Sequence, residues 1–188
     1  DTTISLVWRK SESFQEAIEG QMDVEVCGSV LTFDAYAFPK HSYLPLDAVG
    51  SLAKHIDENW NVTVINNTEL DEIWKPDDEE VVVYTRLDSM QPGTFPSTYA
   101  CTWFTNNIKV HVISESDVNA DQFVMNLLQD LQERERFVMN DGSPFFVNQL
   151  AYSTKLDPLK DGQVTVRGQY GKLRDVETVD ELKTITIS

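Results

Sequence analysis

The hydrophobic residues of this chain repeat with a helical period in two segments. In the first, Asp47 is a suitable N-cap residue, and the apolar side chains after it fall on one helical face: Val49, Leu52, Ala53 and Ile56. In the second, a spacing of i, i+4, i+8 has further apolar residues beside it: Phe123, Val124, Leu127, Leu128 and Leu131. The pattern predicts a helix over 47–57 and a longer helix over about 120–138.

Alternating apolar residues, often β-branched or aromatic, indicate strands in the rest of the chain. We predict strands over residues 3–8, 22–38, 62–65, 81–87, 99–104, 108–113, 145–153, 164–170 and 183–187. Gly28 and Ser29 are a candidate hairpin turn, and Gly93 with two prolines predicts a loop over 88–98. Asn106 and Asn107 are expected to interrupt or bulge the strands around them.

The order of these elements predicts the fold class. From residue 47 onwards it is helix, three strands, helix and two strands, which is typical of an α+β fold. We expect a mixed, largely antiparallel sheet with the two main helices on one face. Residues 1–46 are predicted to be a β-rich N-terminal extension or arm, and residues 47–188 the α+β core domain.

Length and charge agree with one domain and an arm. The chain has 188 residues, of which 41% are hydrophobic, so it can bury a sizeable core. Its formal charge of −16 counts against a protein that binds nucleic acid over a broad surface or docks on an anionic membrane. The acidity lies mainly in the first half, because residues 1–94 carry 6 basic and 18 acidic side chains.

One acidic run is the most prominent candidate for function. Residues 69–80 hold seven carboxylates and one lysine, and Pro76 prevents a regular helix interior there. Clustered carboxylates can bind Ca²⁺ or Mg²⁺, but the run lacks the ligand spacing and the glycine of an EF-hand loop. We interpret it as a solvated or partner-facing loop, in which the tryptophan is an interface anchor or a packing residue. The candidate residues are Glu69, Asp71, Glu72, Trp74, Asp77, Asp78, Glu79 and Glu80.

No motif predicts an enzyme, a cofactor or a metal site. The chain has no Walker A or GxSxG sequence, and Gly168 and Gly171 are too sparse for a dinucleotide fingerprint. The three histidines and the two cysteines lack metal-ligand spacing. The sequence leaves a disulfide between Cys27 and Cys101 open, and we expect two free, buried thiols instead. Among 31 carboxylates some close pairs are inevitable, so a glycosidase-type pair has no specificity as a signal. We expect neither a membrane span nor a signal peptide.

Four segments, taken in order, resemble one protein family. They are the helix and strand over 47–65, Lys75-Pro76 with Val81–Tyr84, the strand and helix start over 108–123, and the closing strand 161–171. Across residues 46–173 they are similar to the tail-terminator and tail-completion proteins of tailed bacteriophages, which include head-tail joining and minor tail proteins. The first 46 residues depart from the compact members of this family.

The resemblance implies a non-enzymatic structural protein of the virion tail or neck, assembled in the host cytoplasm, without a cofactor. It implies a ring of identical subunits, commonly a hexamer, that terminates the tail tube and joins it to the head connector. DNA would pass without specific binding, and acidic loops in the lumen would repel its phosphates. The alternative is an acidic binding module, such as an inhibitor that mimics DNA.

Overall fold

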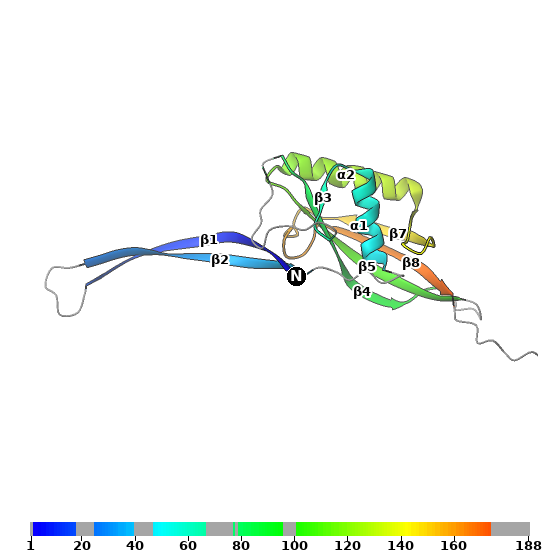
Figure 1. The fold of residues 1–188 in the computed structure, drawn as a ribbon, viewed down its shortest axis with the longest axis horizontal. Coiled ribbons are helices and arrows are strands. Elements are labelled where there is room, and N and C mark those ends of the chain that lie inside the picture. Colours follow the sequence, from blue (N-terminus) through cyan, green and yellow to red (C-terminus); the bar gives the residue numbers. More distant parts are fainter. Residues whose placement is uncertain are drawn as a thin grey trace, which may run out of the picture.

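The chain folds into a two-stranded hairpin and a six-stranded sheet that carries two helices (Figure 1). The computed structural model describes residues 2–17, 25–39, 47–66, 77, 79–95 and 101–173. The elements in chain order are β1 (Thr2–Ala17), β2 (Glu25–Pro39), α1 (Ala48–Asn59), β3 (Thr63–Val64), β4 (Val82–Pro92), β5 (Cys101–Ile113), α2 (Asp117–Arg134), β6 (Arg136–Val138), β7 (Pro144–Tyr152) and β8 (Val164–Leu173).

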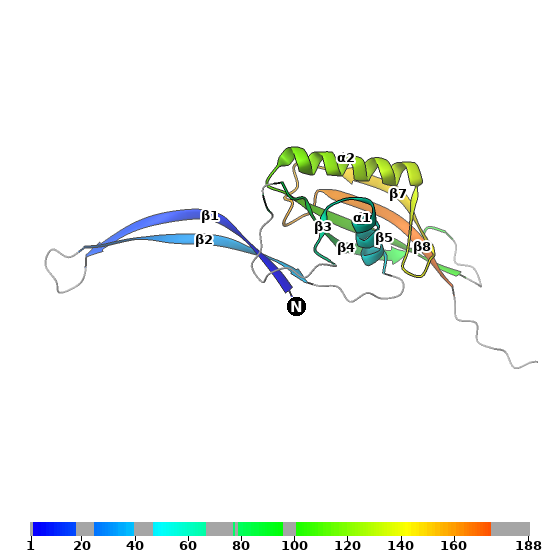
Figure 2. The same ribbon diagram turned by 45° about the horizontal axis from the view of Figure 1, so that its top comes forward.

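The strands of the main sheet lie in the order β3-β4-β5-β8-β7-β6. β3 runs parallel to β4, and the remaining neighbours are antiparallel. Both helices cover one face of the sheet, as Figures 1 and 2 show. The predicted α+β class, with a mixed and largely antiparallel sheet, is therefore confirmed.

The main core lies between the helices and the sheet. Leu52 and Ile56 of α1 are fully buried, as are Leu127 and Leu131 of α2. Burial of each such side chain contributes about 1.5–3 kcal/mol. They pack against alternate residues of the strands: Val83, Ile108, Val110, Val112, Phe145, Val164 and Val166. The residues whose period predicted the helices are thus the ones that hold the helices on the sheet.

The other side of the sheet, which we call the open face, carries a smaller cluster. Val82, Tyr84 and Ile113 pack there with Ile65 and with Leu159, which follows β7. Side chains alternate between the two faces of a strand. Residues that flank the core positions of β4, β5 and β8 therefore lie on the open face.

Side-chain caps begin both helices. The Asp47 side chain accepts a hydrogen bond from the Val49 backbone N–H at 3.0 Å, which confirms the predicted N-cap. The Ser116 hydroxyl oxygen accepts one from the Asn119 backbone N–H at 3.3 Å. α2 consequently begins three residues earlier than predicted, at Asp117.

The predicted end of the second helix at Val138 is wrong. α2 ends at Arg134, because Glu135 adopts a left-handed conformation with φ of 54°. The next three residues form β6, which pairs with β7. Phe137 enters the core from β6, so an apolar residue that prolonged the helical pattern belongs to a strand.

β4 and β5 are longer and more regular than predicted. β4 continues to Pro92, so the first part of the predicted loop 88–98 is strand. β5 runs without interruption through Asn106 and Asn107, because it pairs there with β4 on one side and β8 on the other. The irregularity lies in β4 instead, where the register shifts between Leu87 and Ser89.

The predicted hairpin turn at Gly28 and Ser29 is also wrong, because both residues lie inside β2. Gly28 is paired with Phe14 of β1, and a Cβ atom at residue 28 would lie 2.6 Å from the Phe14 ring. The glycine therefore makes room for an aromatic ring across the strand pair.

Cys27 is exposed and Cys101 half-buried, both as free thiols, so the expectation of two buried thiols is wrong for Cys27. The predicted strand 183–187 lies outside the described residues.

Candidate functional site

Three residues of the predicted acidic loop lie in the described part of the chain: Asp77, Glu79 and Glu80. The Glu80 carboxylate accepts hydrogen bonds from the Thr63 hydroxyl and, at 3.3 Å, from the Asp77 backbone N–H. The Ser114 hydroxyl donates to the Glu80 carbonyl oxygen at 2.8 Å. Glu80 thus holds the segment before β4 against its own domain, whereas Asp77 and Glu79 are exposed. The other predicted residues lie outside the described ranges: Glu69, Asp71, Glu72, Trp74 and Asp78.

The hairpin of β1 and β2 carries large apolar side chains on one of its faces. Its register pairs Trp8 with Phe33, and alternation along the strands puts Leu6 and Leu31 on the same side. Their exposed fractions are 44% for Leu6, 58% for Trp8, 57% for Leu31 and 48% for Phe33. We call these four residues the hairpin apolar face.

The opposite face of the hairpin is more polar. It carries an ion pair between Arg9 and Asp34 and another between Lys10 and Glu12, whose charged atoms lie 2.7 Å apart. A register shift between Trp8 and Lys10 puts these two residues on opposite faces. Two exposed apolar residues stand nearer the distal end of this face: Phe14 and Val30.

The hairpin apolar face has the properties of an interaction site. An isolated two-stranded hairpin is marginally stable in water, and contiguous exposed apolar side chains mark interaction sites. β1 and β2 make their extensive contacts with each other. Sequence reasoning predicted an arm here but did not identify its apolar face. The available signal was the number of large apolar residues in a segment too short to bury them.

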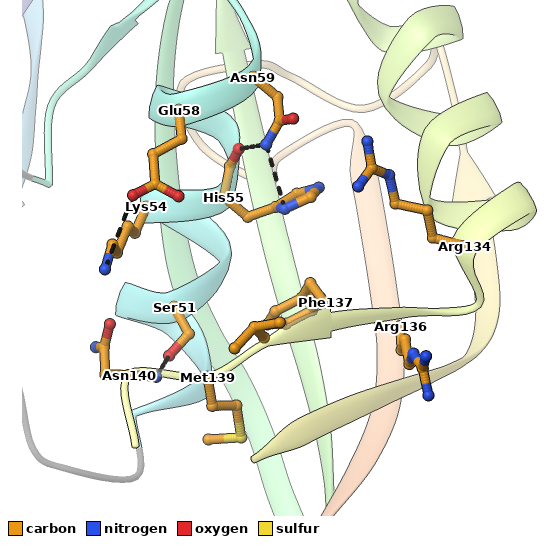
Figure 3. Close-up of a pocket in the computed structure, with 11 residues that line it drawn as sticks. Ser51, Lys54, His55, Glu58, Asn59, Arg134, Arg136, Phe137, Met139 and Asn140 are labelled. Atoms are coloured by element: carbon orange, nitrogen blue, oxygen red, sulfur yellow. Dashed lines mark hydrogen bonds and ion pairs between the residues drawn. The ribbon is translucent and has the colours of Figure 1, made fainter. Parts of the chain in front are cut away.

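A polar pocket of about 550 Å³ lies between α1 and β6 (Figure 3). α1 supplies one wall, and the end of α2 with the segment over 136–140 supplies the other. Its ionisable lining residues come from three elements: Lys54, His55, Glu58, Arg134 and Arg136. The fully buried ring of Phe137 packs against the His55 ring with 6.1 Å between centroids.

Three basic side chains that line this pocket lie beside a carboxylate. His55 Nε2 lies 2.9 Å from an Asp130 carboxylate oxygen, and Arg134 Nε lies 2.5 Å from the other. Lys54 Nζ lies 3.8 Å from a carboxylate oxygen of Glu58, which also lines the pocket. The contact between His55 and Asp130 ties α1 to α2.

His111 lies on the open face and is buried. Its Nδ1 is 2.7 Å from the Pro158 carbonyl oxygen, and its Nε2 is 2.9 Å from Arg86 Nε. Because a guanidinium only donates, Nε2 accepts and Nδ1 carries the proton. Burial lowers the pKa of His111, and the nearby charges of Arg86 and Lys109 lower it further. His111 is therefore a neutral, structural histidine.

Comparisons of the sequence with protein-family models and with curated proteins found no match. The resemblance to tail-completion proteins accordingly stays a prediction from the four sequence segments. Within the described ranges, no group of three or more His, Cys, Asp or Glu side chains could hold a metal ion. None of the helices found there is long and apolar enough to cross a membrane. The hairpin apolar face is the surface that most needs a partner.

Proposed function

We propose that this chain is a non-enzymatic structural protein of a tailed-bacteriophage virion, which forms a ring at the tail end or in the neck. In this role it terminates the tail tube, joins it to the head connector and assembles in the host cytoplasm. The observation that carries the proposal is the hairpin apolar face, because it is a surface for protein association. The resemblance of residues 46–173 supplies the kind of assembly.

The energetic need for a partner can be estimated from the two aromatic residues of this face. Trp8 and Phe33 leave 58% and 48% of their surfaces in solvent. A buried aromatic side chain covers ~150–250 Å², so covering the exposed half of each removes on the order of 100 Å² from water. At ~25 cal/mol/Å² this is about 2.5 kcal/mol for each side chain. Two such aromatics with two leucines form an anchor of the kind found at interface centres.

The position of the hairpin suits an exchange between copies. Figures 1 and 2 show that it extends beside the sheet domain and does not cover it. If the arm of one copy packs on the next, the contact joins two different surfaces, and repetition of such a contact closes into a ring when the rotation permits. This supports a cyclic assembly over a symmetric pair.

The charge of the chain fits a ring through which DNA moves. With a net charge of −16 the protein repels phosphates over most of its surface. Asp77 and Glu79 are exposed and suited to face a lumen, whereas Glu80 is held by Thr63. DNA would thus pass without specific binding.

The test uses the full chain and two double variants. Trp8→Ser with Phe33→Ser removes the aromatic part of the hairpin apolar face, and Lys10→Ser with Glu12→Ser is the matched control on the other face. Native mass spectrometry and electron microscopy should show closed rings for the wild type and the control, and dissociated subunits for the aromatic variant. A wild-type chain that stays monomeric at high concentration and binds a DNA-binding protein tightly would instead support the acidic binding module.

A further inference from the structure

The centre of the open face is basic, although the chain as a whole is acidic. Val83, Val110 and Val166 pack on the helices. Arg86, Lys109 and Arg167 stand an odd number of residues away from them along the same three adjacent strands, so they lie on the open face. Arg86 is the direct cross-strand partner of Lys109. β8 pairs with the other edge of β5, where Thr165 is the partner of Lys109. Arg167 lies two residues beyond Thr165 on the same strand. The three cations therefore span two strand spacings, about 10 Å, across the sheet and two residues, about 7 Å, along it.

These three cations, which we call the basic row, have no carboxylate partner among the described residues. Arg86 donates to His111 Nε2 at 2.9 Å, and Lys109 Nζ donates to the Thr165 hydroxyl at 2.8 Å. Arg167 makes no hydrogen bond or ion pair with any residue of the described ranges. All three are half-buried. Like charges directly across a strand pair repel each other and destabilise the pair. An anionic group bound beside Arg86 and Lys109 would offset this repulsion.

The outer face of α2 has the opposite character. Asp117 and Asp121 are exposed one helical turn apart, about 5–6 Å. Beside them Val118 and Met125 leave 77% and 59% of their surfaces in solvent. We call these four residues the α2 patch. The hydrogen bond from the Tyr152 hydroxyl to Asp121 is the main cause that raises the pKa of Tyr152 to about 12, and the charge of Asp117 adds to it.

We propose that the α2 patch of one copy docks on the basic row of the next copy. The two surfaces belong to opposite sides of the sheet domain, as the position of α2 in Figure 2 shows. Each copy thus presents an acidic patch on one side and a basic row on the other. Contacts between unlike surfaces propagate head to tail, and they close into a ring when the rotation between copies permits. This inference rests on the proposed function and adds a second contact between neighbouring subunits, besides the hairpin apolar face.

Charge complementarity favours a second copy over DNA as the occupant of the basic row. DNA brings its phosphates against the whole field of a chain with a charge of −16, and a basic row of three residues is small for a nucleic-acid footprint. The α2 patch instead combines two carboxylates with two apolar side chains. When a second copy covers the apolar side chains, water is also excluded from the neighbouring carboxylates, which strengthens their attraction to the basic row.

Charge reversal tests the interface in full-length chains. Lys109→Glu with Arg167→Glu puts carboxylates opposite Asp117 and Asp121, and should raise the dissociation constant of the assembly by roughly 100-fold or more. Combining it with Asp117→Lys and Asp121→Lys in one chain exchanges the signs of both surfaces and should restore assembly. The control Lys155→Glu with Lys160→Glu has the same charge change at exposed positions after β7 and should assemble like the wild type. Thermal unfolding of every variant establishes that each is folded.

The outcomes separate this inference from the proposed function. A wild-type ring that the reversal at Lys109 and Arg167 leaves intact overturns the interface and leaves the ring in place. Failure of the combined variant to assemble, although folded, also overturns it. A wild-type monomer overturns both proposals. If the wild type binds duplex DNA in fluorescence anisotropy and the reversal at Lys109 and Arg167 abolishes this binding, the basic row serves DNA and the second copy is excluded.

Discussion

Asn66 completes the short strand β3 with its side chain, and its replacement should destabilise the sheet strongly. Its side-chain amide donates to the Thr85 carbonyl oxygen, and its side-chain oxygen accepts from the Thr85 backbone N–H, both at 2.8 Å. Asn66 is 6% exposed and Thr85 fully buried. Asn66→Ala leaves both backbone groups of Thr85 without these partners. At about 1–3 kcal/mol for each, the loss should be about 2–6 kcal/mol.

Urea unfolding followed by circular dichroism measures this loss. Asn126→Ala, on the exposed side of α2, is the control and should change the free energy of unfolding by less than about 0.5 kcal/mol. Asn66→Asp keeps the acceptor but places a buried carboxylate oxygen at the Thr85 carbonyl. It should be at least as damaging as alanine near neutral pH and recover when the acid is protonated and can donate. A loss below about 1 kcal/mol for Asn66→Ala would refute the reasoning.

Three further predictions concern His111, Gly168 and Ser116. Burial lowers the pKa of His111, so its contribution to stability is complete above about pH 6.5 and is lost as the pH falls from there towards the lowered folded-state pKa. His111→Gln should remove that part of the pH dependence in urea titrations, while the dependence due to carboxylates persists. Gly168→Ala would drive a Cβ atom into the Phe145 ring and the Phe146 carbonyl oxygen, and should cost at least about 1–3 kcal/mol in thermal unfolding. Ser116→Ala removes the N-cap of α2 and should cost about 0.5–2 kcal/mol in the same assay.

The sequence predicted those elements whose apolar period is long and faces a single core. Both helices satisfy this condition, and the Asp47 cap marked the start of α1. The end of α2 escaped prediction because Glu135 adopts a left-handed conformation that usually belongs to glycine or asparagine. β6, with three residues, is too short for a period of its own, and Phe137 sits where a helical apolar residue would.

Strand lengths were less predictable because they depend on pairing between distant segments. Asn106 and Asn107 looked like an interruption, but β5 has partners on both sides that keep it extended. The long hairpin shows the same effect, since cross-strand pairing carries β2 straight through Gly28. Local composition does not contain this information.

The candidate surfaces were predicted in part. The acidic run was evident from composition, yet Glu80 proved to be bound by its own domain, which only the proximity of Thr63 and β3 reveals. The hairpin apolar face could be identified only from the pairing of β1 with β2, because the register shift after Trp8 decides on which face of the hairpin each side chain lies. The basic row likewise appears only when three strands separated in sequence become neighbours.

The mass of the full-length chain in solution shows whether the subunits assemble into the proposed ring. Each subunit has a mass of 21.4 kDa, so native mass spectrometry distinguishes a ring from a free subunit without ambiguity. We expect a single closed assembly, a hexamer if the resemblance extends to stoichiometry, with a central opening visible by electron microscopy. A homogeneous species of 21.4 kDa at high protein concentration would contradict it.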